Sequence, residues 1–448
     1  MGRNSVKRLV RVEKTSQTIT VFRIIDYLAF AALMIFLVVI ILSSSMANIQ
    51  TDSIDYYAIM QKLTQNGGNP IVRNLHFVEQ RSPGFPILSL IPYHITSLLI
   101  EPLVQTEEVV TPTGLAQNPH LQPPTERILI PSEPLLFKDI FYKNFYIETQ
   151  DSWFEWKIIA PMLLASYTFL FVGLIVTVKT LGLRYKSILG ASLVTLLVIT
   201  SSVFMHNIVA TPAYATLTAF GINCLFTYFF VKGCLSDRSA PQFMSGLFVG
   251  LLVLTRLETV VIAAVVLVLL VALREFGFLK NYFLGSLLAA AILLFYNFSQ
   301  FGNPFHLGIL TGDINLISFD LGYIYANLFH PQSGILFWST LVSLGITGLF
   351  LDENRYMKIL GFSALALIAL FLVRVPVMYN CVGEGARIIG GLPVMCPDNM
   401  ADAIMLVRSD VNRYITVLIP FSVLGLRVII SFVPELLSRS GLWRGGAT

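Results

Sequence analysis

Two acidic side chains and several arginines have the types and spacing that chemistry would need. Asp52 and Asp55 stand about one helical turn apart in TDSIDYY, so both can point to one side of a helix. Arg81 opens the segment RSPGFP, and Arg256 lies between two apolar stretches in LLVLTRLETVV. Arginines hold phosphate through charge-assisted hydrogen bonds, and a nearby carboxylate can take a proton. The residue types therefore suit a phosphate-bearing ligand.

Other polar residues accompany these candidates at the ends of apolar segments. Glu258 follows Arg256 closely, and ionisable residues between apolar stretches are costly and usually functional. Arg413 opens the last long apolar segment, and His206 ends an earlier one. Tyr56 is a supporting candidate because tyrosine suits the boundary between water and lipid.

Each candidate also admits a purely structural role. Asp52 and Asp55 can cap a helix N-terminus, where the macrodipole favours acids. Arg256 can form a structural ion pair with Glu258 at a helix turn, and Arg81 can snorkel at a helix start. The prolines of RSPGFP stiffen the chain, and its glycine permits a close approach of another backbone.

The composition defines the class of protein that must position these residues. Hydrophobic residues make up 55% of the chain and charged residues 12%, with a mean hydropathy of +0.73. Soluble domains carry about a quarter charged residues. Repeated apolar segments of spanning length therefore predict an all-α, polytopic integral membrane protein with one domain over residues 1–448. The net charge of +4 follows membrane topology and does not indicate nucleic-acid binding.

Ten membrane spans are expected, with the N- and C-termini in the cytoplasm. The short loops between them that would face the cytoplasm are rich in Lys and Arg, which agrees with the positive-inside rule. The basic start of the chain reads as a retained anchor and not as a cleaved signal peptide. The predicted spans are residues 24–46, 157–178, 187–205, 211–231, 242–258, 259–273, 281–298, 335–351, 359–377 and 414–434.

One apolar segment is not counted as a span. Residues 85–104 have spanning hydropathy, but counting them would reverse every later loop, and Pro92 and His94 interrupt them. We expect an interfacial helix there. Residues 47–156 then form one large extracytoplasmic loop with an irregular centre over 105–135. The stretch Thr255–Glu258 is expected to be a tight turn between two abutting spans, or a break in one long hairpin.

The cysteines and histidines indicate a possible disulfide and metal site, but less specifically than the motifs above. Cys381 and Cys396 share the predicted outer loop 378–413 and could close a disulfide in an oxidising compartment, or remain two unpaired thiols. All six histidines fall at or near the predicted outer face. Asp52, Asp55 and a histidine could hold a divalent ion, but no spacing is diagnostic, so metal dependence stays open.

The ordered set of short motifs resembles the GT-C superfamily of integral membrane glycosyltransferases. The resemblance is to the branch of protein O-mannosyltransferases and lipid A aminoarabinose transferases, and it runs with gaps over most of the chain. The first mark is DSIDYY, similar to an acidic D-x-x-x-Y start. The other marks are RSPGFP, TRLE, YN with FGNP at residues 296–304, SGIL at 333–336 and NRY at 412–414.

The resemblance implies transfer of a sugar from a polyprenyl-phosphate donor to an extracytoplasmic lipid, glycan or protein, with inversion. It implies Asp52, with Asp55 in reserve, as the general base. It implies Arg81, Arg256 and Arg413 as ligands of the donor phosphate, and membrane lipids as the surroundings. Outer loops 47–156, 299–334 and 378–413 would recognise the acceptor.

Departures from the family pattern keep a second function open. The place after the third span where members often carry another acid reads MHNIVATPAY, without a carboxylate. No large soluble domain follows the tenth span. The alternative is a non-catalytic GT-C-like protein that serves as a structural or lipid-binding subunit of a membrane complex. A transporter is disfavoured, because the polar residues gather at one face and not near the midplane.

Overall fold

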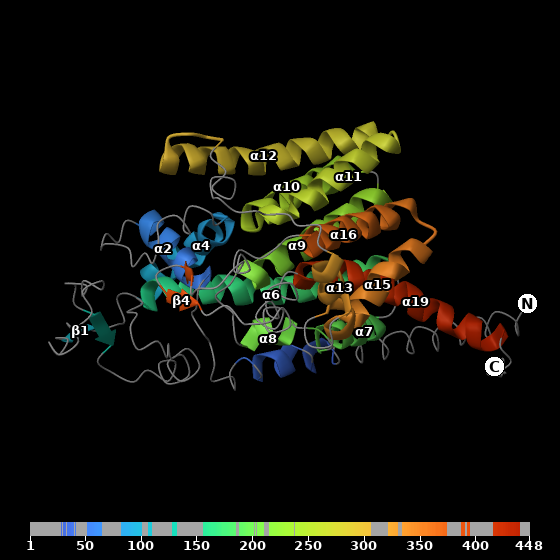
Figure 1. Cartoon of the computed structure of the whole chain (residues 1–448), viewed down its shortest axis with the longest axis horizontal. Helices are drawn as coiled ribbons and strands as arrows, with labels where there is room; N and C mark the ends of the chain where they lie inside the picture. The colour runs from blue at the N-terminus through green and yellow to red at the C-terminus, as the bar shows by residue number, and fades with distance from the viewer. Residues whose placement is uncertain are drawn as a thin grey trace, which may run out of the picture.

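The fold is described by a computed structural model of the chain, which is a bundle of helices (Figure 1). The structure describes most of the predicted transmembrane part, together with short segments of the predicted outer loops. The described residues are 28, 30–32, 34–39, 41, 52–64, 82–100, 106–109, 128–131, 156–184, 188–200, 202, 204–209, 215–236, 238–305, 321–329, 334–373, 387–389, 392–394 and 415–439.

Helices account for nearly all of the regular structure in these ranges. Helical residues also occur between positions 28 and 41. The helices are α2 (Asp52–Thr64), α4 (Gly84–Ile100), α6 (Trp156–Arg184), α7 (Ile188–Thr200), α8 (Phe204–Val209), α9 (Ala215–Ser236), α10 (Ser239–Thr255), η3 (Leu257–Thr259), α11 (Val260–Ala272), α12 (Phe276–Phe301), α13 (Leu321–Phe329), α14 (Ile335–Trp338), α15 (Thr340–Leu351), α16 (Arg355–Val373), η6 (Thr416–Leu418) and α19 (Ile419–Arg439).

Two short antiparallel ribbons accompany the helices. Strand β1 (Thr106–Val109) pairs with β2 (Ile128–Pro131), and β3 (Arg387–Ile389) pairs with β4 (Leu392–Val394). The first ribbon lies in the stretch expected to be irregular. Its β-branched residues favour a pleated strand over a loop. The helical class expected from the sequence is confirmed, and the ribbons are additions to it.

The predicted spans coincide with apolar helices. Four helices in the described part of the chain are long and apolar enough to cross a membrane, and they lie in α6, α9, α12 and α16. The other predicted spans fall on shorter apolar helices. The chain is an integral membrane protein, while the number of crossings stays a prediction.

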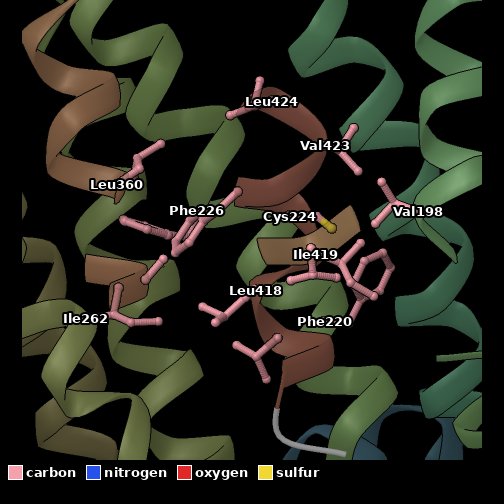
Figure 2. Close-up of a cluster of buried hydrophobic side chains, with 14 of the residues drawn as sticks. Val198, Phe220, Cys224, Phe226, Ile262, Leu360, Leu418, Ile419, Val423 and Leu424 are labelled. Carbon is pink, nitrogen blue, oxygen red and sulfur yellow. The ribbon is translucent and has the colours of Figure 1, made fainter. Parts of the chain in front are cut away.

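Helix α9 runs through the middle of the bundle, between α6 and α10 (Figure 1). The large core brings together Val198 of α7, Phe220 and Phe226 of α9, Ile262 of α11 and Leu418 of η6 (Figure 2). All five side chains are fully buried or nearly so. The core therefore joins helices from the middle and last thirds of the chain.

Glycines let several of these helices approach closely. A Cβ atom added to Gly425 of α19 would lie 1.7 Å from the carbonyl oxygen of Gly345 in α15. A Cβ at Gly246 of α10 would lie 1.8 Å from the carbonyl oxygen of Tyr282 in α12. Close backbone approach at small residues is the usual source of helix association within membranes. These glycines fix the spacing of both helix pairs.

Replacing Gly425 by alanine is expected to destabilise the protein, because the new methyl group meets backbone that cannot rotate away. Overpacking of this kind costs about 1–3 kcal/mol. The expected result is a fall of several degrees in the apparent melting temperature of the purified protein in detergent. Gly182→Ala is the matched control, since nothing lies within 4 Å of a Cβ there. Equal melting temperatures for the two variants would contradict the prediction.

Basic residues gather at the end of the bundle opposite α2 and α4 (Figure 1). Helices α10 and α12 run parallel, because Gly246 faces Tyr282 while Gly250, one turn later, faces Ala289. Their N-termini therefore lie at one end, and α11 leads from the C-terminus of α10 back to that end. Arg355 at the start of α16 pairs with Glu275 at that same end. Lys232, Arg238, Arg274, Lys280 and Lys358 lie on the neighbouring helix ends and connections.

The basic end is expected to face the cytoplasm. A cysteine at exposed Ser236 should react with an impermeant maleimide only after the cells are permeabilised. A cysteine at exposed Asn303, at the other end of α12, or at His120 should react in intact cells. The native cysteines are replaced by serine in this background. Labelling at position 120 only from the cytoplasmic side would overturn the proposed orientation.

Candidate functional site

The chain breaks sharply at Arg256, between α10 and α11. Helix α10 ends at Thr255, and Arg256 takes an extended backbone conformation with φ −146° and ψ 105°. The single turn η3 follows and leads into α11. Because α10 and α12 are parallel and α11 connects them, the chain reverses here. The tight turn predicted at Thr255–Glu258 is confirmed.

The Arg256 side chain is buried at this turn, with 7% of the residue exposed. Its Nη1 donates a hydrogen bond to Thr216 Oγ1 on the first turn of α9, at 3.5 Å. Its Nη2 lies 3.8 Å from Glu258 Oε1, so the ion pair considered from the sequence is present. A buried cation is costly unless it is paired, and this one is held by a hydroxyl and a carboxylate. The geometry therefore presents a fixed cation at one end of the bundle.

The segment RSPGFP packs directly on this turn. Ser82 Oγ accepts a hydrogen bond of 3.1 Å from the backbone N–H of Leu257. A Cβ on Gly84 would lie 2.4 Å from the carbonyl carbon of Leu254, at the end of α10. The predicted close approach at this glycine is confirmed. Two motifs that are far apart in the sequence therefore form one contact.

Helix α2 joins the same region through aromatic packing. Tyr56 meets Phe85 edge-to-face, with ring centroids 5.3 Å apart. Tyr56 is buried in a small cluster that is separate from the large core, so it supports the site by packing. The buried members of this small cluster are Tyr56, Tyr57, Ile59, Met60, Phe85, Met162, Leu163, Ala165 and Ala215. The cluster binds α2 and α4 to α6 and to the start of α9.

A further motif reaches the small cluster from α12. Tyr296 packs against the cluster, and the neighbouring Asn297 donates a hydrogen bond of 3.2 Å to the carbonyl oxygen of Pro304. Gly302 ends α12 with a positive φ of 69°, a conformation that glycine adopts without strain. The motif YN…FGNP therefore lies at the same end of the bundle as DSIDYY, RSPGFP and TRLE.

The remaining predicted site residues are only partly described. Asp52 is the first residue of α2 and Asp55 lies in its first turn, but both side chains fall outside the described atoms. The His206 side chain does so too, although its helix α8 is tied to α6 by a bond from Tyr167 Oη to the Ile208 carbonyl, at 3.3 Å. Outside the described residues altogether are Arg81, Arg413, Cys381 and Cys396.

Two contacts of the candidate site were not anticipated from the sequence. Thr216 carries no charge and matches no motif, so nothing singled it out as the partner of Arg256. Ser82 stands within RSPGFP, but its role depends on Leu257, which lies far away in the sequence. The residues that the structure describes contain no group of three His, Cys, Asp or Glu side chains that could hold a metal ion.

Comparison with known proteins shows a shared fold. No protein-family model matches the chain, and no curated protein matches its sequence. The chain is similar to the crystal structure of ArnT from Cupriavidus metallidurans in the apo state. That match has a TM-score of 0.52 and 13% sequence identity, and it covers 93% of this chain and 61% of ArnT. The chain thus spans about three fifths of ArnT and shares its overall fold.

Proposed function

We propose that this protein is a GT-C-type membrane glycosyltransferase. It moves a sugar from a polyprenyl-phosphate donor to an acceptor on the extracytoplasmic side, where a lipid, glycan or protein receives it. The observation that carries the proposal is the buried Arg256, held at a helix break where α2, α4, α9 and α12 converge. Ionisable residues placed between membrane helices are costly and usually functional, and an arginine fixed in this way can bind an anion such as a phosphate.

The fold supports the same function. ArnT is a membrane glycosyltransferase, and its architecture is the one that this chain shares. Four of the six motifs quoted from the sequence converge on the small cluster or on the contact beside it, although they are spread over some 250 residues of sequence. Convergence at one end of the bundle is expected when a donor phosphate and an acceptor must meet.

Each candidate residue has a role in this reaction. Asp52, with Asp55 in reserve, acts as general base and takes the proton of the acceptor hydroxyl. The acceptor oxygen then attacks the anomeric carbon as the bond to phosphate breaks, so the configuration inverts. Arg81, Arg256 and Arg413 stabilise the charge on the departing phosphate, and Glu258 orients Arg256.

The competing function is a non-catalytic GT-C-like subunit that binds lipid or supports a membrane complex. The missing acid in MHNIVATPAY favours this alternative. Incubating the purified protein with labelled polyprenyl-phosphate sugars and membrane extract separates the two. An enzyme transfers label to an acceptor and releases polyprenyl phosphate. A structural subunit transfers none, whether or not the labelled lipid binds.

A further inference from the structure

Ser82 supplies a cap to a helical segment that begins 175 residues later in the chain. Leu257 is the first residue of η3, and the first N–H groups of a helix have no partner within the helix. The residue in the N-cap position is Arg256, whose side chain makes no capping hydrogen bond. Ser82 Oγ accepts the bond from Leu257 in its place, and serine is among the preferred capping residues.

The cap bears directly on Arg256, because Leu257 shares a peptide bond with it. The Arg256 N–H donates to the Leu252 carbonyl at 2.8 Å. The Arg256 carbonyl accepts from Thr259 N at 3.0 Å and from Thr259 Oγ1 at 2.7 Å. The Leu257 N–H donates to Ser82 Oγ. The N–H and the carbonyl of Arg256 and the N–H that follows them therefore all have hydrogen-bond partners. The guanidinium can then reach Thr216 on α9 from a fixed backbone.

The packing of RSPGFP against the end of α10 fixes the position of Ser82. A Cβ on Gly84 would lie 2.4 Å from Leu254 C and 2.5 Å from Thr255 N, so the two backbones touch. Pro83 between Ser82 and Gly84 is buried, and its ring fixes φ. Ser82 is therefore placed against Leu257 by packing on the end of α10, and not by its own hydrogen bond alone.

We propose that Ser82 is a positioning residue for Arg256. Its cap keeps the turn at Thr255–Glu258, here called the arginine turn, in the conformation that presents the Arg256 guanidinium to the phosphate of a lipid-linked donor. Ser82 itself does not bind the phosphate. An anion then gains its bond to Arg256 without first ordering the turn, which is the advantage of preorganisation. This inference rests on the proposed function and adds the residue on which its anion site depends.

Binding of polyprenyl phosphate in detergent micelles tests the inference without requiring turnover. Ser82→Ala should raise the Kd about three- to tenfold, the scale expected for losing one helix cap. Ser82→Thr should restore most of the affinity, because threonine also caps and Ser82 is only half-buried. Ser89→Ala is the matched control, since that buried hydroxyl bonds the Phe85 carbonyl within its own helix. It should leave the Kd unchanged.

A double substitution shows whether Ser82 acts through Arg256. In an Arg256→Ala background, Ser82→Ala should change the Kd less than it does in the wild type. Equal changes in both backgrounds would overturn the inference, as would a lower melting temperature with an unchanged Kd. If the wild type binds no polyprenyl phosphate, the proposed function fails and this inference with it. If Arg256→Ala weakens binding but Ser82→Ala does not, this inference alone fails.

Discussion

Replacing Asp52 by asparagine is expected to reduce sugar transfer by about two to four orders of magnitude, the usual scale for a general base. Donor binding should remain nearly intact, because the substitution keeps the shape of the side chain and leaves the arginines in place. Asp52 opens α2, and Tyr56 one turn later anchors this helix on Phe85. Rates of transfer at saturating donor, together with the donor Kd, measure the two effects separately.

Asp55→Asn and Thr64→Ala complete this test. Asp55 is the reserve for the same role, so the variant with the larger loss identifies the base. Thr64 lies at the end of the same helix, and its hydroxyl bonds the Met60 carbonyl at 3.0 Å. Thr64→Ala perturbs α2 without removing an acid and should keep nearly full activity. Full activity in both asparagine variants would mean that the acids only cap the helix.

Replacing Arg256 by alanine is expected to weaken donor binding about ten- to a hundredfold. A hydrogen bond to a charged group contributes roughly 1.5–3 kcal/mol, which corresponds to that loss of affinity. Arg256→Lys should recover part of it, because the charge survives while the planar fork of donors does not. The same order, arginine above lysine above alanine, is expected at Arg81. Titrating the donor at fixed protein concentration gives the comparison.

Arg355 provides a matched control at the opposite end of the bundle. It pairs with Glu275 as Arg256 pairs with Glu258, but it lies far from α2 and α4. Arg355→Ala removes one arginine and one ion pair, yet it should leave the donor Kd within about twofold of the wild type, since exposed pairs contribute little. Equal losses in the two alanine variants would show that Arg256 only stabilises the fold.

Much of the bundle could be predicted from the sequence, because apolar runs report directly on helices in a membrane. The break at Thr255–Glu258 was predictable for the same reason, since two charges interrupt otherwise continuous apolar sequence. The close approach at Gly84 followed from the conformational freedom and small size of glycine. Each of these signals is local, and the structure confirms them.

The contacts that bring the candidate site together could not be predicted from local sequence signals. The bond between Ser82 and Leu257 and the bond between Arg256 and Thr216 join distant residues, and neither leaves a periodic pattern. Tyr56 was expected at the water–lipid boundary, but its ring is buried against Phe85. The short ribbons were not predicted either, because strand pairing depends on tertiary context more than on hydropathy.

The lengths of the helices around Arg256 place it relative to the hydrocarbon layer. Helix α11 has 13 residues and α10 has 17, so they extend about 20 Å and 26 Å. Both are shorter than a hydrocarbon core of about 30 Å. Helix α12, parallel to α10, has 26 residues and extends about 39 Å. In the predicted ten-span arrangement, with the basic helix ends at one surface, we expect the turn at Arg256 to lie several ångströms beneath the other surface, or the bilayer to thin around it. A phosphate that stays attached to its lipid can be drawn down to that depth, whereas a water-borne nucleotide sugar would have to leave water to reach it.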